Sequence, residues 1–600
     1  MNREQVGKLM GKLSAADLTL YYPGGQQNEF WSAVLDSPSY EQDVRAVKAE
    51  GARLLGTQTP ELTYELFSEF EREGKRLGYE HVYFARRRRL NTFALLSLFE
   101  PENLSYLEEL CEIIWAICDE YTWCLPAHLK DCEADKTIDL FSSETGFTLS
   151  EISLLLGERF PPLLRNRIAA EVSDRLFVPY LEHGPHHWET AKHNWSAVCA
   201  GSIGAAALLQ KGPLARLEEI VTKVLGSMNC YLEGFGEDGV CQEGVGYWNY
   251  GFGYYVYFSD LLKRRTQGRL NLFASFKVHQ IALFQQKVYL YGNAVANFSD
   301  SVPFVGIQIG LTHYLANIYP DMEVPSLEHR TEYTDDHCSR WAPALRNFIW
   351  LDSSKQTSDW ASAAYYMVDA QWLVSRHETN NGRFGFAVKA GHNGEPHNHN
   401  DVGHFILMGE EAIIAADLGC GEYTQAYFGA GRYDYDCNGS QGHSVPIIDG
   451  FGQVEGEGHA AENVKVQTGA GEDYMALELS GAYNVPHLRK LKRKLVWHKT
   501  DMPWLSLEDK FTFSSVPRRI TERIVTRCRP TVMENGIVGL SNGADQSASI
   551  RYDTHGADVL ITARSYSDHF GQASEYYTID FELKELSLVN RFSLTIEMKE

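Results

Sequence analysis

Residues 391–419 read GHNGEPHNHNDVGHFILMGEEAIIAADLG and mark the place where the character of the chain changes. Four histidines crowd into the first half of this stretch, and an apolar run then leads to Asp417. Crowded imidazoles repel one another when they are charged, so such a cluster is costly unless the rings have a task. We therefore expect a functional site here, at the start of a β-rich half.

The chain before this stretch, up to about residue 350, shows the apolar periodicity of helices, with breaks at prolines and glycines. Residues 107–118 and 205–209 are typical of it. Many successive amphipathic helices with short loops indicate paired helices wound into a toroid or solenoid. No strict repeat is visible, so a consensus-repeat array is not expected.

From about residue 380 the segments become short, alternating and rich in β-branched and aromatic side chains. Examples are residues 385–389, 490–497 and 557–563. Residues 409–411, Gly-Glu-Glu, fit a hairpin turn. This half is predicted to be an antiparallel β-sandwich. The expected fold class is multidomain, α then β, with a helical domain over residues 1–365 and a β-sandwich over residues 366–600.

Charge and composition exclude several classes of protein. The 600 residues carry a formal net charge of −24, and 44% are hydrophobic and 22% charged, as in an ordinary soluble globular protein. Nucleic-acid binding needs a basic surface, so no nucleic-acid partner is expected. No stretch reads as a membrane span, so no membrane partner is expected either. The oligomeric state does not follow from the sequence.

The cysteines and the N-terminus bear on the compartment. The 11 cysteines are scattered and form no CxxC pair, which favours reduced thiols. The first residues, MNREQVGKLMGKLSAADLTLYY, contain no apolar segment of a signal peptide. We expect a cytoplasmic protein as written, or a periplasmic or secreted one if this is the mature form of an exported protein.

A metal site is predicted in the β-rich half. His399, Asp417 and His443 offer the nitrogen and oxygen ligands that zinc takes in tetrahedral geometry. The loose spacing also fits a hydrogen-bonded histidine network without metal. His397 then remains available to substrate, because it lies beside the metal ligands without being one of them. His404 has no assigned role beyond packing or loop hydrogen bonds.

The first candidate stretch of the helical half is residues 186–198, HHWETAKHNWSAV. Aromatic faces stack on sugar rings, and amides bind hydroxyls or carboxylates, so this stretch suits carbohydrate recognition. The alternative is that Asn194 caps a helix and that the indoles belong to the core. The candidates for substrate binding here are His187, Trp188, His193 and Trp195.

The second candidate stretch is residues 238–255, DGVCQEGVGYWNYGFGYY, where glycines among aromatics allow close approach of a ligand. Glu243 and Tyr247 are candidates for binding substrate. A tyrosine here could serve as general acid or base, or the whole run could form a structural belt.

A run of four arginines, residues 86–89, is unusual in so acidic a chain. Four consecutive positions cover all sides of a helix, so at most two of them can face a cleft. Arg86 and Arg89 are the candidates for binding carboxylate or sulfate. For the other two, Arg87 and Arg88, a solvated face paired with local acids is expected.

Taken together, these residues resemble the heparinase II/III-like polysaccharide lyases. The resemblance rests on Asn194 in HNW, Tyr250 in EGVGYWNYG, and the HNHNDVG stretch at residues 397–403, followed by Asp417 and by SQGH at residues 440–443. It covers nearly the whole chain. It implies an N-terminal incomplete (α/α) toroid followed by a C-terminal antiparallel β-sandwich, with a substrate cleft between them.

The resemblance also implies cleavage of uronic-acid polysaccharides by β-elimination. Asn194 would neutralise the uronate carboxylate, Tyr250 would be the catalytic acid/base, and His397 would be the second proton-transfer residue. His399, Asp417 and His443 would hold a structural zinc ion. Some relatives have a histidine in place of this asparagine, so His193 is a rival to Asn194.

Other relatives use a second tyrosine in the β half, for which Tyr433 and Tyr435 are candidates. We expect an acidic glycosaminoglycan as the substrate, such as hyaluronan, chondroitin or dermatan sulfate, or heparan sulfate. Alginate or another polyuronate is the nearest alternative. A glycoside hydrolase that uses Asp238, Glu243 or Glu189 is a different class, and it leaves the histidine stretch unexplained.

Overall fold

The computed structural model describes residues 3–129, 133–210, 212–409, 412–543 and 545–599. The chain divides into two compact units, each described here by itself. The first unit, which we call the helical unit, comprises Met1–Phe235, Tyr247–Ala282 and Gly306–Thr357. The second, the β unit, comprises Gly236–Gly246, Leu283–Val305 and Ser358–Glu600. Two segments from within the predicted helical domain thus belong to the β unit, and a domain boundary after residue 365 stays a prediction.

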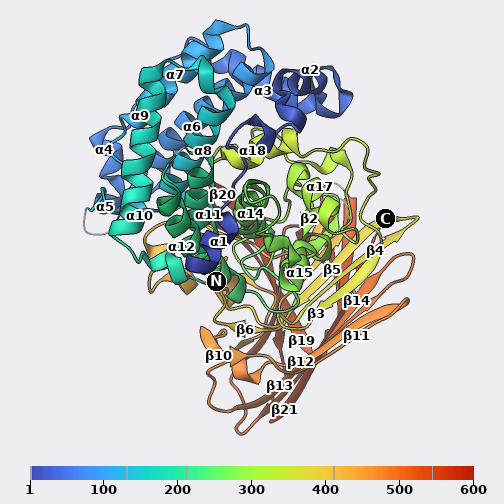
Figure 1. Ribbon diagram of the computed structural model, residues 1–600. Coiled ribbons are helices and arrows are strands. Elements are labelled where there is room, and N and C mark those ends of the chain that lie inside the picture. Colours follow the sequence, from blue (N-terminus) through green and yellow to red (C-terminus); the bar gives the residue numbers. More distant parts are fainter. Residues whose placement is uncertain (1–2, 130–132, 211, 410–411, 544, 600) are drawn as a thin grey trace. The chain divides into compact units, whose positions relative to one another are not determined.

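The helical unit consists of α-helices that follow one another along the chain (Figure 1). Its helices are α1 Arg3–Met10, α2 Gln27–Asp36, α3 Glu41–Leu54, α4 Tyr64–Phe67, α5 Glu69–Glu73, α6 Leu77–Phe99, α7 Leu104–Cys118, α8 Leu140–Leu156, α9 Pro162–Val172, α10 Val178–Glu182, α11 Asn194–Leu209, α12 Leu214–Glu233, α14 Gly253–Arg265, α15 Phe276–Ala282, α17 Ile309–Ile318 and α18 Trp341–Ile349. The short helix α13, Val245–Tyr247, spans the junction of the two units, and α16, Phe284–Val288, lies in the β unit.

Helix α11 lies at the centre of a group of packed helices in the helical unit. It packs against α8, α12 and α14, and its residues from Ser196 onward are buried, because small residues such as Ala200, Gly201 and Gly204 let its neighbours approach closely. A Cβ on Gly204 would lie 2.5 Å from a ring carbon of Phe258 in α14, so only glycine fits there. Close packing thereby fixes the positions of α8, α11 and α14, and α11 carries the candidates Asn194 and Trp195.

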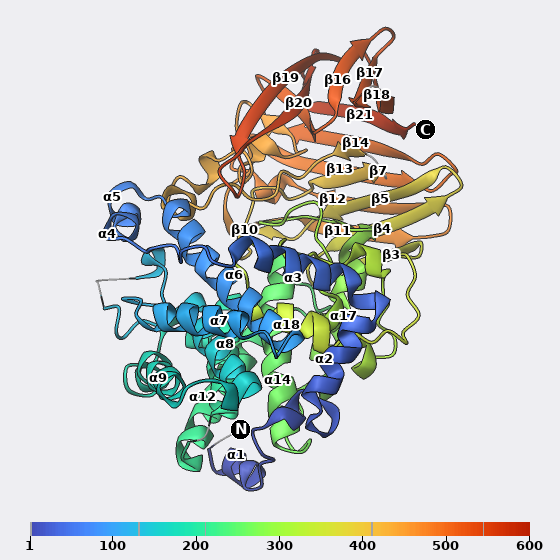
Figure 2. The same cartoon turned by 90° about the horizontal axis from the view of Figure 1, so that it is seen from above.

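The β unit contains antiparallel sheets, as the alternation of its sequence predicts. A five-stranded sheet has the order β3 Ala363–Met367, β4 Trp372–Thr379, β5 Gly382–Lys389, β7 Phe405–Gly409 and β8 Ala412–Ala415. An eight-stranded sheet has the order β11 Glu462–Thr468, β12 Glu472–Glu478, β13 Leu488–His498, β14 Trp504–Phe513, β21 Val589–Met598, β18 Asp545–Tyr552, β17 Ile537–Asn542 and β16 Arg529–Met533. Figure 2 shows β12, β13 and β14 side by side.

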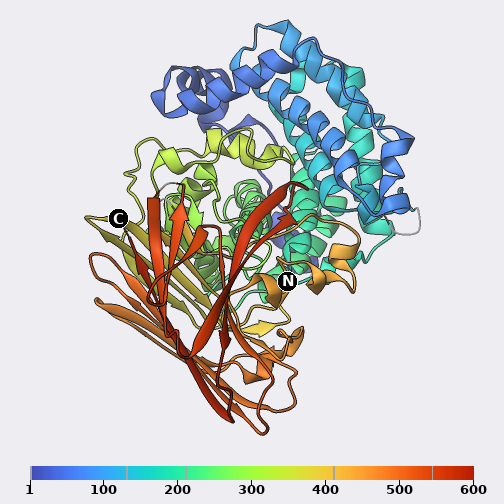
Figure 3. The same ribbon diagram turned by 180° about the vertical axis from the view of Figure 1, so that it is seen from behind.

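A four-stranded sheet, β19 Ala557–Ser567, β20 Ala573–Leu583, β15 Ile520–Thr526 and β9 Ile447–Ile448, lies in the same unit (Figure 3). Two further strand pairs are β1 Tyr289–Tyr291 with β2 Ala294–Val295, and β6 His392–Asn393 with β10 Gly456–Ala460. The inward residues of the three large sheets share one hydrophobic core, in which Phe386, Trp497 and Ile579 are buried. Buried and less buried residues alternate along β14 and β21, whereas β7 and β15 are buried throughout. The core shared between the sheets makes this a sandwich. Of the turn predicted at residues 409–411, Glu410 and Glu411 lie outside the described residues.

The predicted order of a helical region followed by antiparallel sheets is confirmed. None of the helices in the described part of the chain is long and apolar enough to cross a bilayer. The cysteines within the described ranges form no disulfide.

Candidate active site and metal centre

Tyr250 lies in a π-helical turn, Trp248–Phe252, that leads into α14. Single π-turns are rare and are frequent at functional sites. Tyr250 and Tyr254 are four residues apart, and both hydroxyls donate hydrogen bonds to one carboxylate, that of Glu144 in α8. The Tyr254 hydroxyl lies 2.6 Å from Glu144 Oε2. Glu144 therefore fixes the position of the Tyr250 hydroxyl.

The electrostatic surroundings keep Tyr250 protonated. Burial, and then the negative charge of Glu144, raise the pKa of the Tyr250 phenol well above its usual value. Arg340 opposes this shift, because its guanidinium carbon lies 4.1 Å from the centre of the Tyr250 ring and its Nε lies 3.5 Å from Glu144 Oε2. Asp336 holds this arginine at 2.8 Å. At neutral pH Tyr250 can thus donate a proton.

Asn194 lies next to the turn that carries Tyr250. It is the first residue of α11, and His193 rather than Asn194 occupies the N-cap position, without a side-chain cap hydrogen bond. A Cβ on Gly251 would lie 3.1 Å from the Cα and Cβ of Asn194, so the glycine after Tyr250 lets the two segments touch. Asn194 is buried, and its Oδ1 has no hydrogen-bond partner among the described residues. A buried amide oxygen without a partner is costly, which is typical of a ligand site.

The aromatic candidates of residues 186–198 differ in exposure. Trp188 is fully buried and its indole donates to the Ile138 carbonyl at 2.9 Å, which argues against stacking on a substrate. Trp195 is half-buried between the rings of His128 and His187, at 4.8 Å and 5.3 Å. His187 is exposed, whereas His193 is half-buried. Tyr247 is also half-buried.

Two arginines of the run, Arg86 and Arg89, are held by acids and backbone carbonyls of the helical unit. Arg86 donates to Glu120 at 2.7 Å and to the carbonyls of Pro60 and Ala116 at 2.8 Å each. Arg89 is paired with Glu109, and both arginines are buried. Instead of facing a cleft, as expected from the sequence, both side chains pair with acids of α7 and of the turn after it. These contacts argue against a role in binding substrate.

In the β unit the main hub is Asp300, a residue that the sequence did not point to. His397 Nδ1–H donates to Asp300 Oδ2 at 2.6 Å, and His399 Nε2–H donates to Oδ1 at 3.0 Å. The hydroxyls of Tyr423 and Tyr427 donate at 3.0 Å and 2.6 Å. Burial opposes the charge, but the hydrogen bonds from the two histidines hold the pKa of Asp300 well below its usual range.

His397 is a half-buried member of this hub, with 19% of its side chain accessible. Its φ of +54° places a non-glycine residue in the left-handed region, a strain that is common at functional sites. Its Nε2 lies 3.4 Å from Glu243 Oε1. Burial lowers the pKa of His397, but the hydrogen bond to Asp300 outweighs it and the net shift is upward.

Two other expected residues of this region can be placed. Gly244 has a φ of +97° and lets the loop of Glu243 pass close to Ser301. Any side chain at position 244 would place its Cβ only 2.7 Å from the Cβ of Ser301. The Tyr433 hydroxyl accepts a hydrogen bond from Asn398 at 3.3 Å. Both Glu243 and Tyr433 thus lie beside the His397 loop or its partners.

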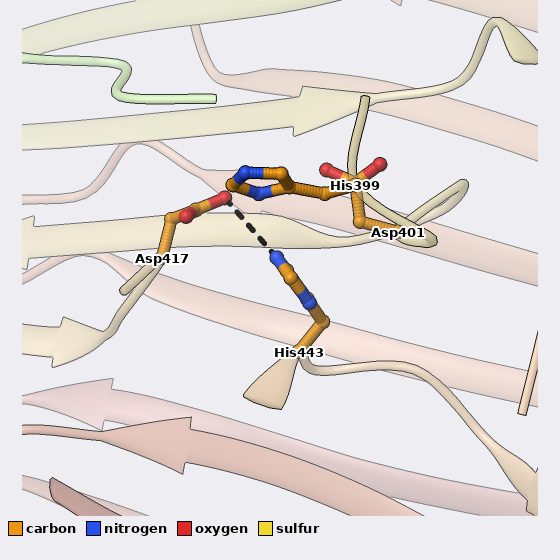
Figure 4. Close-up of side chains that lie close together, drawn as sticks. All are labelled: His399, Asp401, Asp417 and His443. Carbon is orange, nitrogen blue, oxygen red and sulfur yellow. Dashed lines mark ion pairs between the residues drawn. The ribbon is translucent and has the colours of Figure 1, made fainter. Parts of the chain in front are cut away.

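The three predicted metal ligands converge. His399, Asp417 and His443 are buried, and with Asp401 they offer ligand atoms within 4.8 Å of one another (Figure 4). His399 Nδ1, His443 Nε2, Asp417 Oδ2 and Asp401 Oδ2 are buried without a hydrogen-bond partner in the described part of the protein. Polar atoms are rarely buried in this way unless something binds them. This cluster could hold a metal ion.

The charged groups around this cluster also favour a bound cation. The ammonium of Lys389 is fully buried between Glu395 and Asp401, at 2.9 Å from each. With Asp417, three buried carboxyl groups face one buried ammonium, and a divalent cation would stabilise their ionised forms. Burial raises the pKa of Asp417 well above its usual value and lowers that of His443 to about 4, so the His443 imidazole is neutral and can ligate.

Comparison with solved structures shows the fold. A mutant heparan sulfate lyase from Pedobacter heparinus has a TM-score of 0.60 and 13% identity, over 100% of this chain and 94% of that one. Chondroitin AC lyase from Streptomyces coelicolor A3 has a TM-score of 0.53 and 10% identity, over 95% and 82% of the two chains. A Paenibacillus xanthan lyase has a TM-score of 0.50 and 10% identity, over 100% of this chain and 60% of its own.

No family model matches the sequence, and a search of curated proteins finds no match. The structural comparison, in contrast, shows similarity over the full length of the chain to heparinase III-type lyases, as the sequence motifs predict. At these identities the similarity establishes the fold, and the residues described above have to carry any statement about activity.

Proposed function

We propose that this protein is a polysaccharide lyase that cleaves uronic-acid-containing glycosaminoglycans by β-elimination and releases unsaturated oligosaccharides. One observation carries the proposal. Two proton-transfer groups, Tyr250 and His397, are each hydrogen-bonded to a buried carboxylate, Glu144 and Asp300, in a chain with the fold of polysaccharide lyases. Such clamping sets both the position and the protonation state of an acid or base.

The reaction needs three contributions. The C5 proton of a uronate is weakly acidic while the carboxylate is charged, so the carboxylate must first be neutralised. A base then takes the C5 proton, the C4–O4 bond breaks as the C4–C5 double bond forms, and an acid protonates the departing O4. We assign the first task to Asn194, whose unpartnered Oδ1 can accept a hydrogen bond from the substrate carboxyl group once that group has taken up a proton from solvent.

Tyr250 is assigned to O4. Its phenol is protonated because burial and Glu144 raise its pKa, so it is ready to give a proton to the leaving oxygen. In units where the C5 proton lies on the same face as O4, Tyr250 first passes its proton to Glu144, to which its hydroxyl donates, and the phenolate then takes the C5 proton and gives it to O4. In units of the opposite C5 configuration, His397 is the base.

The position of His397 fits that task. Its Nδ1–H is committed to Asp300, so Nε2 is the nitrogen that exchanges the proton with substrate. Glu243 beside Nε2 favours the imidazolium that forms when His397 accepts a proton. Trp195, Tyr247 and Tyr433, which are half-buried, are the aromatic groups proposed to contact the sugar chain.

Hyaluronan, chondroitin or dermatan sulfate and heparan sulfate remain the first candidates, with alginate or another polyuronate as the alternative within the same chemistry. The buried positions of Arg86 and Arg89 remove the argument for a sulfate-binding cleft that the arginine run suggested. We propose that the metal is zinc and that it is structural, because two imidazoles and carboxylates suit zinc better than calcium or magnesium.

The test is a panel of these polymers assayed for the ultraviolet absorbance of the unsaturated uronate. Tyr250→Phe should lower kcat on every polymer, by about 10²–10⁴-fold. His397→Gln should do so mainly on polymers rich in iduronate. Tyr319→Phe is the matched control in the helical unit, since its hydroxyl donates to a backbone carbonyl, that of Phe273, at 2.8 Å.

Two results would count against these assignments. Equal loss on glucuronate and iduronate polymers in both variants would remove the division of labour between Tyr250 and His397. Turnover without an unsaturated product on any polymer would remove the lyase assignment itself.

A further inference from the structure

The metal cluster contains more potential ligands than a tetrahedral ion can take. Besides His399, Asp417 and His443, both Asp401 and His404 have buried atoms without a hydrogen-bond partner among the described residues, Asp401 Oδ2 and His404 Nε2. His404 Nε2 lies 3.5 Å from Asp417 Oδ2, which makes it look like a fourth ligand. The hydrogen bonds made by the second nitrogen of each imidazole ring decide whether His404 or Asp401 is the fourth ligand.

A neutral imidazole has one nitrogen with a proton and one with a lone pair, and only the lone pair can bind a metal. His399 Nε2 faces the ionised carboxylate of Asp300 and must carry the proton, so Nδ1 has the lone pair. His443 Nδ1 faces the Gly439 carbonyl at 2.8 Å and must carry the proton, so Nε2 has the lone pair. In both rings the nitrogen without a hydrogen-bond partner is the one that can ligate.

His404 is the opposite case. The backbone N–H of Ser444 donates to His404 Nδ1 at 2.9 Å, which occupies the lone pair of that nitrogen. Nε2 therefore carries the proton and cannot ligate. It is directed at Asp417 Oδ2, where a proton-bearing nitrogen would steady the carboxylate.

Asp401 has the free electron pairs that His404 lacks. Its Oδ1 accepts from Lys389 at 2.9 Å, whereas Oδ2 has no hydrogen-bond partner within the described ranges. Its ligand atom lies within 4.8 Å of those of His399, Asp417 and His443, and a tetrahedral ion would draw such atoms to about 3.4 Å from one another.

We propose that Asp401 is the fourth protein ligand of the ion, with His399, Asp417 and His443, and that His404 stays outside the coordination sphere. Four protein ligands leave no open position for water or substrate, which is the arrangement of a structural site. Lys389 then ties the ligand Asp401 to Glu395. This inference concerns the metal alone and holds or fails independently of the proposed reaction.

X-ray absorption at the metal edge tests it, on protein loaded with zinc. The proposal predicts two imidazoles around the ion in the wild-type protein and the same two in His404→Gln. Three imidazoles in the wild type, with one lost in His404→Gln, would overturn it. This measurement does not require any variant of Asp401 to fold.

Cobalt(II) binding gives the second readout. Asp401→Asn should weaken cobalt affinity by more than about 100-fold, because loss of a ligand costs more than the 10–100-fold typical of an outer partner. It should also replace the intense visible bands of a tetrahedral ion by weaker ones. The matched control is Asp473→Asn, a fully buried aspartate paired with Lys499 at 2.9 Å, which should leave both unchanged. An unaltered spectrum and affinity in Asp401→Asn would refute the assignment.

Discussion

Asp300→Asn is the substitution that separates the proposed roles most sharply. The carboxylate accepts hydrogen bonds from His397, His399, Tyr423 and Tyr427, and it is fully buried. An asparagine keeps the shape but turns one oxygen into a donor. If that donor faces His397, the ring must place its lone pair on Nδ1 and its proton on Nε2, so Nε2 can no longer act as a base.

The expected loss follows from these contacts. Losing a correctly placed acid–base group lowers kcat by about 10²–10⁴-fold, and KM should change little because Asp300 is not accessible to substrate. The second donor, His399, is a proposed metal ligand, so metal affinity should fall about 10–100-fold. Breaking a buried charged network should lower the free energy of unfolding by about 3–5 kcal/mol.

The assay measures kcat and KM from the absorbance of the unsaturated product, metal affinity by competition with a chelating dye, and stability by denaturant unfolding. Asp436→Asn is the matched control, because this aspartate also accepts a tyrosine hydroxyl, that of Tyr576 at 2.6 Å, outside the hub. The reasoning is refuted if kcat stays within threefold of the wild type on iduronate polymers, or if the loss lies wholly in KM.

Three further predictions concern the rest of the molecule. Removing the metal with a chelator should lower the free energy of unfolding by about 4 kcal/mol relative to protein with zinc at a thousand times its Kd, and zinc should restore it; unchanged melting would contradict a structural ion. Arg86→Ala should cost about 3 kcal/mol of stability by weakening the pairing of Glu120 while KM stays within twofold, and a selective rise in KM would restore the substrate-binding role. Burial lowers the pKa of His313 to about 4, so stability should fall by about 3 kcal/mol between pH 6.5 and pH 4 as the unfolded imidazole takes up a proton. His313→Asn, which can still accept from the Asp352 backbone N–H, should flatten this pH dependence, and an unchanged slope in denaturant unfolding would disprove it.

The fold was predictable because burial leaves a periodic trace. The alternation of β14 and β21 appears as buried and exposed positions in turn, and it is visible in the sequence without knowledge of the partner strands. The convergence of His399, Asp417 and His443 was predictable too, since few arrangements make crowded histidines worthwhile.

The partners of the candidate residues were not predictable, because they are distant in the chain. Asp300 lies 97 residues before His397, and Glu144 lies 106 residues before Tyr250. No local pattern marks either acid as buried. The spacing of Tyr250 and Tyr254 was a usable signal for a shared partner on one helix face, although it does not name Glu144.

For the arginine run, the sequence suggested a role in binding that the contacts of Arg86 and Arg89 do not support. Four arginines in an acidic chain suggested a solvated face or an anion site, yet Arg86 and Arg89 neutralise acids inside the helical unit. Whether an arginine faces solvent or a buried glutamate depends on tertiary packing that a local sequence does not contain.

The most direct test of the central claim is to digest a susceptible uronic-acid polymer in water enriched in oxygen-18 and to weigh the products by mass spectrometry. Elimination breaks the C4–O4 bond without adding water. We therefore predict products that absorb in the ultraviolet and carry no oxygen-18 from the cleavage step. Products that gain one labelled oxygen at each cleaved bond and lack the chromophore would show hydrolysis, and would contradict the assignment of Tyr250 and His397 to a lyase reaction.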